Sequence, residues 1–447
     1  MSTLTLSIVV IFCIGYLFIA IESVTKINKA AIALLMMVVT WTLFMLSPDS
    51  YLPEAVGSQS ANVVNELIER HLGSTATTLF FLMGAMTIVE LVDQNGGFNF
   101  VRDVMHTHSK RGLLWRISFM TFFLSAILDN LTTAIVMIMI LRKLIDDPRE
   151  RMVYASLVII AANSGGAFSP IGDVTTIMLW NKGFITALHL ISKLLIPSVI
   201  SIAIPAYILS LSLKGRLTSA LGQAQAVQAS DLTARQRKVI FFLGVGGLLF
   251  VPVFKSITDL PPFVGIMLVL GVLWTLTEVF YAHLKTDEEE GGMQKRVSQM
   301  LSRIDMSTIL FFLGILMAVD CLETIGVLSG LGQWLNDAFD GNNYLIASII
   351  GVLSSIVDNV PLVAGCMGMY PVASVGDMAV DGIFWQMLAY CAGVGGSILI
   401  IGSAAGVVVM GLEKITFGWY MRHVSWLAFL GYIAGIVCYW AEQTFIF

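Results

Sequence analysis

The sequence predicts an all-α polytopic membrane protein made of two inverted repeats, each with five transmembrane helices and one re-entrant helical hairpin. Three observations favour this fold class: an apolar composition, a series of apolar runs of about bilayer length, and motifs that recur in the second half. Of the 447 residues, 57% are apolar and 12% are charged. Soluble proteins carry about 25% charged residues. This composition excludes a soluble enzyme, a nucleic-acid-binding protein and a disordered scaffold.

Most of the apolar runs are long enough to cross a bilayer as one helix, which takes about 20 residues. Two further runs, 113–141 and 344–370, carry Asp129-Asn130 and Asp358-Asn359 near their middles. Each run is long for one crossing and short for two, so we expect a hairpin that enters the membrane, turns at Asp-Asn and leaves on the same side. Full crossings are expected at 4–22, 29–46, 75–93, 152–180, 188–213, 236–254, 262–284, 304–323, 383–411 and 422–441.

The placement of lysine and arginine supports the re-entrant interpretation. If both hairpins are re-entrant, 21 of the 25 basic residues fall in loops on one side, and only Arg70, Lys182, Lys193 and Lys255 fall on the other. The larger set includes Lys29, at the end of the first loop. Loops rich in Lys and Arg remain in the cytoplasm. We therefore expect both termini outside, on the side of the membrane opposite the cytoplasm.

The two halves of the chain match at an offset of about 230 residues. Each half then holds five crossings and one hairpin, and because five is odd, the second half lies upside down relative to the first. Inverted repeats with interrupted helices are typical of secondary transporters. We expect the first repeat at 1–213, a cytoplasmic connector at 214–235 and the second repeat at 236–447. The matched segments are 79–82 with 310–313, 125–130 with 354–359, and 162–166 with 392–396.

Candidate ion-binding residues lie at the hairpin tips and in two interrupted crossings. A carboxylate at membrane depth is costly and marks a functional site, which singles out Asp129 and Asp358. Segment 163–176 breaks the crossing 152–180 with three glycines, one proline and Asp173, and we expect it to be non-helical. Glycines at 393–396 interrupt 383–411, without an equivalent of Asp173. Helix capping by Asp-Asn and ordinary glycine packing are the alternatives.

Oxygen-bearing side chains of this kind suit hard cations and protons. We expect Na⁺ itself at the three aspartates and the two tip asparagines. The full set of candidate cation and proton ligands is Asp129, Asn130, Thr132, Thr133, Asn163, Ser164, Asp173, Thr175, Thr176, Asp358, Asn359 and Ser397.

Acidic residues near the ends of two crossings are either solvated at the interface or part of a proton path or pH response. Two loop histidines, His106 and His108, are weaker candidates for sensing pH. The acidic residues are Glu90, Asp93, Asp320 and Glu323.

The motif Ser-Gly-Gly…Pro-Ile-Gly-Asp over 164–173, together with Asp-Asn-Leu-Thr-Thr at 129–133 and Asp-Asn-Val-Pro at 358–361, resembles the NhaD-type sodium/proton antiporters of the ion transporter superfamily. The resemblance covers essentially the whole chain. It implies exchange of cytoplasmic Na⁺ or Li⁺ for external H⁺ across a bacterial inner membrane, with the outward-facing termini in the periplasm. It also implies a homodimer in which a mobile domain holding both hairpins moves against a scaffold. Related dicarboxylate carriers place Ser-Asn-Thr where this chain has Asp-Asn, and an Asp there would repel a carboxylate.

The sequence therefore predicts a secondary antiporter in which Na⁺ or Li⁺ and H⁺ compete for buried carboxylates in an elevator-like, alternating-access cycle. No Walker motif for ATP is visible, and no cofactor, nucleic acid or enzymatic reaction is expected. We also expect no intramembrane Lys or Arg beside an interrupted helix, where an anionic substrate would need one. The alternatives are an efflux carrier for arsenite or another anionic or neutral oxyacid on the same fold, and a non-transporting membrane scaffold.

Overall fold

The computed structural model describes residues 3–20, 22–52, 60–97, 105, 107, 109–213, 215, 232–282 and 304–446. These residues are nearly all helical, with an isolated β-bridge between Ala373 and Ala379, which confirms the all-α part of the predicted fold class. Within them, six helices are long and apolar enough to cross a membrane, and shorter apolar helices accompany these. Most of the predicted connector, as well as His106 and His108, lies outside the described residues.

Every predicted crossing coincides with a helix or with a pair of consecutive helices. The predicted start of one crossing was wrong, because α4 begins 15 residues before position 75. Its 35 residues span about 52 Å, which is more than the thickness of a bilayer core. Its polar first turns were invisible to a search for apolar runs. The first half contains α1 (Thr3–Ala20), α2 (Glu22–Thr25), α3 (Lys29–Met45), the 3₁₀ turn η1 (Pro48–Ser50), α4 (Ser60–Gln94), α6 (Lys110–Ser125), α7 (Asn130–Leu144), α8 (Pro148–Ala167), α9 (Val174–Asn181) and α10 (Ala187–Ser212).

The second half repeats this order of elements. Its hairpin is α16 and α17, and its interrupted crossing is α18 and α19. The helices are α11 (Ala234–Thr258), α12 (Pro262–Ala282), α14 (Met306–Thr324), α15 (Val327–Ala338), α16 (Asn343–Leu353), α17 (Asn359–Met369), α18 (Ile383–Gly395), α19 (Ala404–Glu413), α20 (Phe417–His423) and α21 (Ser425–Phe445).

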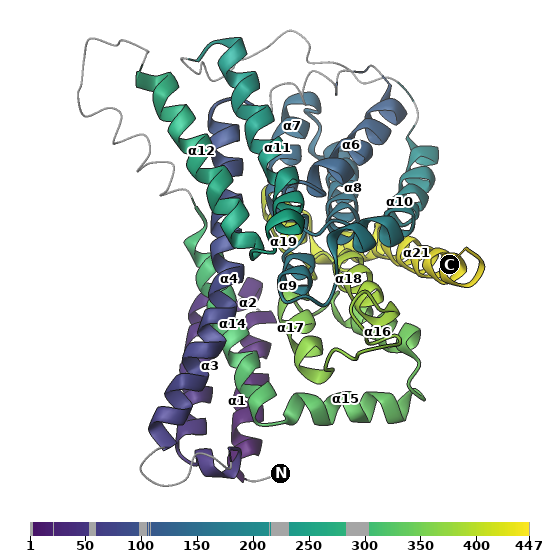
Figure 1. Cartoon of the computed structure of the whole chain (residues 1–447). Helices are drawn as coiled ribbons and strands as arrows, with labels where there is room; N and C mark the ends of the chain where they lie inside the picture. The colour runs from purple at the N-terminus through teal and green to yellow at the C-terminus, as the bar shows by residue number, and fades with distance from the viewer. Residues whose placement is uncertain are drawn as a thin grey trace.

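The helices form two layers. A flanking layer consists of α1, α3, α4, α11, α12 and α14, and a hairpin bundle consists of α6–α10 and α16–α21. Figure 1 shows much of the flanking layer on the left and the hairpin bundle on the right. The layers meet where α14 contacts α17 and where α4 contacts α9.

The hairpin bundle is built around α8 and α18, which are buried on all sides over most of their length. Every residue of α8 from Tyr154 to Ala167 is buried, and so is every residue of α18 from Phe384 to Gly395. The hairpins pack on these two helices at matching positions: the Ser125 hydroxyl donates to the Ala162 carbonyl, and the Ser354 hydroxyl donates to the Ala392 carbonyl. The two halves thus share elements and contacts, while the inversion of one half relative to the other stays a prediction.

The expectation that segment 163–176 is non-helical was wrong at both ends. Residues up to Ala167 remain in α8 and residues from Val174 belong to α9, so the break covers only 168–173. In the second half the break covers 396–403, and residues 393–395 remain helical.

Two of the glycines in those motifs are packing positions instead of helix breakers. A methyl group on Gly165 would lie 2.1 Å from the Phe122 carbonyl oxygen of α6. A methyl group on Gly395 would lie 2.1 Å from the Gly351 carbonyl oxygen of α16. Each glycine lets the first arm of a hairpin touch a buried helix, so the glycine-packing alternative applies at these two positions.

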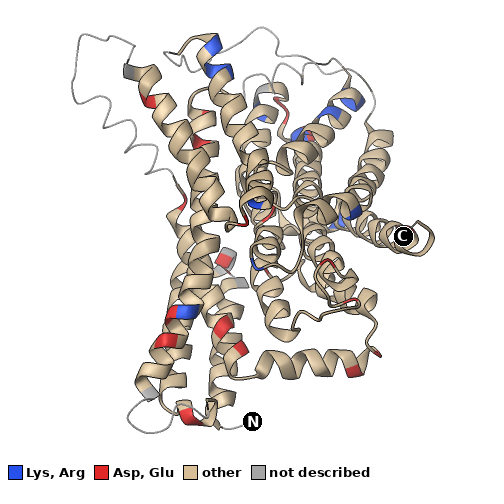
Figure 2. Cartoon of the chain, in the orientation of Figure 1, with Lys and Arg blue, Asp and Glu red and all other residues tan. Residues whose placement is uncertain are grey.

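Lysine and arginine are unevenly distributed over the two ends of the molecule. Figure 2 shows most of them near the end where α6, α8 and α11 begin, whereas aspartate and glutamate occur at both ends. The same asymmetry in the sequence led to the prediction that this end is cytoplasmic. The side on which the termini lie stays a prediction.

Candidate functional site

Four helix N-termini in the hairpin bundle start from a capping side chain at a tip or a break. Asp129 caps α7, Asp173 caps α9, Asp358 caps α17 and Ser403 caps α19. Asp173 and Ser403 are 230 positions apart, so they occupy matching places in the two halves. Capping, offered above as an alternative to ion binding, accounts for one hydrogen bond at each of these residues. The carboxylates of the three aspartates have further lone pairs that can accept hydrogen bonds or bind a cation.

The Asp173 carboxylate is the meeting point of the two hairpins. It is 1% exposed. Its Oδ2 accepts hydrogen bonds from Asn130 Nδ2 at 2.7 Å and Asn359 Nδ2 at 3.2 Å, and its Oδ1 accepts from the Thr175 amide at 2.9 Å and hydroxyl at 2.8 Å. The tips thus reach the centre through their asparagines.

Asn163 extends this network into the second half of the chain. Its Oδ1 accepts from Asn130 Nδ2 at 3.1 Å, while its Nδ2 donates to Ser397 Oγ and Ser403 Oγ, both at 2.9 Å. All of these side chains are buried. In the part of the chain that the structure describes, no Lys, Arg or His forms an ion pair with Asp173. The result is a buried carboxylate that is surrounded by amides and hydroxyls and has no cationic partner among the described residues.

Other predicted ligands lie around this centre without reaching the Asp173 carboxylate. The Thr176 hydroxyl donates to the Asp173 carbonyl at 2.9 Å, and Ser164 accepts a hydrogen bond from Ser201 of α10 at 2.8 Å. The Thr133 hydroxyl is buried and has no hydrogen-bond partner among the described residues.

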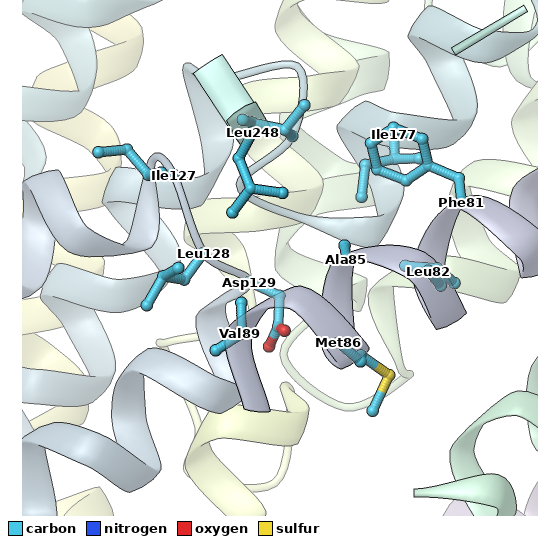
Figure 3. Close-up of a pocket in the computed structure, with 11 residues that line it drawn as sticks. Phe81, Leu82, Ala85, Met86, Val89, Ile127, Leu128, Asp129, Ile177 and Leu248 are labelled. Carbon is cyan, nitrogen blue, oxygen red and sulfur yellow. The ribbon is translucent and has the colours of Figure 1, made fainter. Parts of the chain in front are cut away.

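Asp129 lies beside α4, and Asp173 is not among its hydrogen-bond partners in the described part of the chain. Its two oxygens accept hydrogen bonds from the amide and the hydroxyl of Thr132, both at 2.7 Å. Figure 3 shows the Asp129 carboxylate between Val89 and Met86 of α4, at the wall of a small cavity. That cavity is lined by Phe81, Leu82, Ala85, Met86, Val89, Ile127, Leu128, Asp129, Ile171, Ile177 and Leu248.

Asp358 points towards the flanking layer and forms an ion pair. Its Oδ2 lies 3.1 Å from Nζ of Lys29, in the first turn of α3. Lys29 was expected in a loop, and the structure places it in the first turn of α3 beside a hairpin tip. Its position relative to the membrane stays a prediction. Counting charges by loop cannot show that the α2–α3 turn brings the first residue of α3 against a hairpin tip.

The acidic residues proposed for a proton path lie outside the Asp173 network. Glu90 accepts a hydrogen bond from Gln94 of the same helix at 2.7 Å, whereas Asp93 and Glu323 are exposed. Asp320 is buried, and its Oδ2 lies 3.5 Å from His71 Nδ1 of α4. Sequence reasoning missed His71 because it precedes the apolar run from which the α4 crossing was predicted.

Sequence reasoning also missed a buried ion cluster at one end of the hairpin bundle. The Glu413 carboxylate, fully buried at the end of α19, lies 2.8 Å from Arg142 Nε and 2.6 Å from Arg151 Nε. These contacts join the end of α7 and the start of α8 to the end of α19. Three charged residues at the ends of separate apolar runs gave no sign in the sequence that they meet.

Each of the comparisons with known proteins finds a transporter. A family model described as citrate transporter matches residues 16–388. Sodium/proton antiporter 1 of Arabidopsis thaliana is 46% identical over 98% of this chain and 72% of that protein. The Na⁺/H⁺ antiporter NhaD of Vibrio cholerae is 30% identical over 98% of this chain and 91% of that protein. The YdaH transporter of Alcanivorax borkumensis has a similar fold, with a TM-score of 0.61 at 11% identity over 92% of this chain and 98% of that one.

Proposed function

The chain belongs to the citrate transporter family and, within it, to the NhaD-type sodium/proton antiporters, and from this premise we propose that it exchanges Na⁺ or Li⁺ for H⁺ at Asp173. It is a multi-pass membrane transporter and not an enzyme. The observation that carries the proposal is the buried Asp173 carboxylate, which contacts amides from both hairpin tips and has no ion-pair partner among the described residues. A buried negative charge of this kind needs either a proton or a cation.

The two asparagines provide a way for one carboxylate to accept either ion. In the present geometry Asn130 and Asn359 direct their NH₂ groups at Asp173. A side-chain amide has donors on one side and an acceptor on the other. Rotation of either amide by about 180° would direct its oxygen towards the carboxylate, and a Na⁺ ion would then be held between carbonyl and carboxylate oxygens.

Competition for Asp173 couples the two fluxes. Sodium and a proton both neutralise the carboxylate, so binding of one favours release of the other. Because the site faces each side of the membrane in turn, the inward gradient of H⁺ drives Na⁺ outwards in the direction that the resemblance implies. We assign Asp129 and Asp358 a supporting role, in which their charges raise the local attraction for cations.

The two-layer architecture supports an elevator-like movement. Both hairpins, both breaks and the Arg142–Glu413–Arg151 cluster belong to the hairpin bundle, so the bundle holds a complete site. Its contacts with the flanking layer lie mainly at α17 and α9. In this proposal the bundle moves as a body, while the flanking layer remains fixed and forms a homodimer.

The site favours cations over the tricarboxylate named in the family description. The described network around Asp173 contains one carboxylate, amides and hydroxyls, and Lys29 is already paired with Asp358. Citrate or another anion would meet negative charge without a free basic partner in this network. The same argument weakens the alternative of an anionic oxyacid carrier.

Everted membrane vesicles with a pH-sensitive dye test the proposal. The vesicles are energised, and Na⁺, Li⁺, K⁺, citrate and arsenite are added in turn. We expect Na⁺ and Li⁺ to collapse the pH gradient and the other additions to have no effect beyond that in vesicles without the protein. A response to citrate or arsenite with none to Na⁺ and Li⁺ would refute the proposed function.

A further inference from the structure

Lys29 places a positive charge at the tip of the second hairpin, where the proposed exchange makes no use of it. Its ammonium lies 3.1 Å from Asp358 Oδ2 and 4.2 Å from the centre of the Phe311 ring of α14. The backbone amide of Lys29 donates to the Glu22 carboxylate at 3.1 Å, while its side-chain ammonium donates to Asp358. Lys29 belongs to the flanking layer and Asp358 to the hairpin bundle, so this ion pair connects the two layers.

The sequence of the second tip makes the Asp358 oxygen available. In the first tip, Thr132 uses its amide and its hydroxyl to bind both oxygens of Asp129. The matching position in the second tip is Pro361, which has neither a backbone N–H nor a hydroxyl. Asp358 therefore caps α17 only through the Val360 amide, at 3.3 Å to Oδ1, and its Oδ2 remains for Lys29.

The two tip carboxylates consequently have different surroundings. Asp129 faces apolar side chains of α4 and forms no ion pair among the described residues. Asp358 has Lys29 as its ion-pair partner. The charge on the second tip is thus compensated from the flanking layer, whereas the charge on the first tip is not.

Asp358 is linked to the exchange site through its neighbour in the chain. Asn359 donates to both oxygens of Asp173, at 3.2 and 3.3 Å, so Asp358 lies one residue away from a direct contact with the exchange site. The side chains of Lys29 and Asp358 are 25% and 17% exposed. The pair is therefore partly open to solvent, and a second cation that arrives nearby can compete with the ammonium for the Asp358 carboxylate.

We propose that Lys29 is a tethered cation that neutralises Asp358 while the site is free of Na⁺ and releases this carboxylate when Na⁺ binds beside Asp173. The inference rests on the proposed function and adds a positioning residue to it. Lys29 acts through Asp358: it weakens Na⁺ binding and speeds Na⁺ release, because it recaptures the carboxylate as the ion leaves. Since the pair crosses between layers, its closure and opening accompany movement of the hairpin bundle.

Proteoliposomes that contain the purified protein and a pH-sensitive dye provide the test. Lys29→Gln and Lys29→Met both remove the charge, and Met also keeps the aliphatic stem over Phe311. Lys29→Arg retains the charge. Lys255→Gln is the matched control, because its ammonium also lies over an aromatic ring, that of Trp180 at 4.8 Å, and donates to a backbone carbonyl without an ion pair in the described residues.

We expect both neutral variants to lower the Na⁺ half-saturation concentration three- to tenfold and to reduce the maximal rate. Lys29→Arg should stay within twofold of the wild type in both quantities, and Lys255→Gln should leave the half-saturation unchanged. A merely structural ion pair predicts the opposite sign, namely unchanged or weaker Na⁺ binding once it is lost.

An unchanged or raised half-saturation in either neutral variant overturns the inference while the wild-type response upholds the proposed function. If the neutral variants do not accumulate, a half-saturation in Lys29→Arg that departs from the wild type by more than fivefold overturns it instead. Absence of any Na⁺ response in the wild type would refute the proposed function together with this inference.

Discussion

Replacing Asp173 with Asn removes the negative charge at the meeting point of the two hairpins while keeping a side chain that can cap α9. The amide oxygen can still accept from the Thr175 amide and hydroxyl. Its NH₂ group would face the NH₂ groups of Asn130 and Asn359, and those two amides can relieve the conflict by rotating. Removing the charge also lowers the cost of membrane insertion. We therefore expect normal abundance of the Asp173→Asn variant.

The loss of Na⁺ affinity can be worked out from the geometry. A Na⁺ ion that replaces the asparagine donors would lie no farther from the carboxylate than they do, and those donors are 2.7–3.3 Å away. Two unit charges separated by 4 Å attract by about 4 kcal/mol at an effective dielectric constant of about 20. Since 1.4 kcal/mol corresponds to a factor of ten, the half-saturation concentration for Na⁺ should rise by roughly a thousandfold or more.

Dye-monitored proton flux in proteoliposomes, with Na⁺ varied up to saturation of the wild type, measures this loss. Asp147→Asn is the matched control. Asp147 is an exposed residue that caps α8 by accepting a hydrogen bond from the Arg149 amide at 3.0 Å, and this bond lies outside the Asp173 network. The control should transport normally. Sodium-driven flux in Asp173→Asn within tenfold of the wild type, at equal protein density, would show that Asp173 only supports the break in the helix.

Three further outcomes follow from the structure. Gly165→Ala should destabilise the protein by about 1–3 kcal/mol, because the methyl group would overlap the Phe122 carbonyl, whereas Gly246→Ala, with open space around it, should be neutral in thermal unfolding. Glu413→Gln leaves two arginines without their buried partner and should cost about 3 kcal/mol, measured in the same assay; an unchanged unfolding temperature would contradict this. Finally, lowering the pH should raise the Na⁺ half-saturation concentration in flux assays, because protons compete with Na⁺ for Asp173, and a pH-independent value would argue against one shared carboxylate.

Much of the fold could be predicted because apolar runs and helix breaks depend on the local sequence alone. The hairpin turns at Asp129 and Asp358 and the break before Asp173 all occur where the residues predicted them. Glycine was the ambiguous signal: Gly165 was expected to break a helix, yet it permits close packing within one. Glycine serves both purposes, and only the neighbouring helix decides between them.

The orientation of the tip side chains could not be predicted from spacing. A capping aspartate turns back onto the first amides of its own helix, and this leaves the next residue to face the centre. That is why Asn130 and Asn359, and not Asp129 and Asp358, contact Asp173. The pairing of Lys29 with Asp358 depends on packing between residues that are 329 positions apart, and no local pattern encodes it.

The Asp173 carboxylate accepts hydrogen bonds from both halves of the chain, and this has a consequence for biogenesis. Asp173 and Asn130 enter the membrane with the first half of the chain, but Asn359, Ser397 and Ser403 are synthesised much later. During that interval the nascent first half carries an acidic group whose partners are incomplete, and the cell must tolerate or shield it until translation of the second half ends. If the two halves are produced as separate polypeptides, each should accumulate poorly alone and be rescued by co-expression of the other.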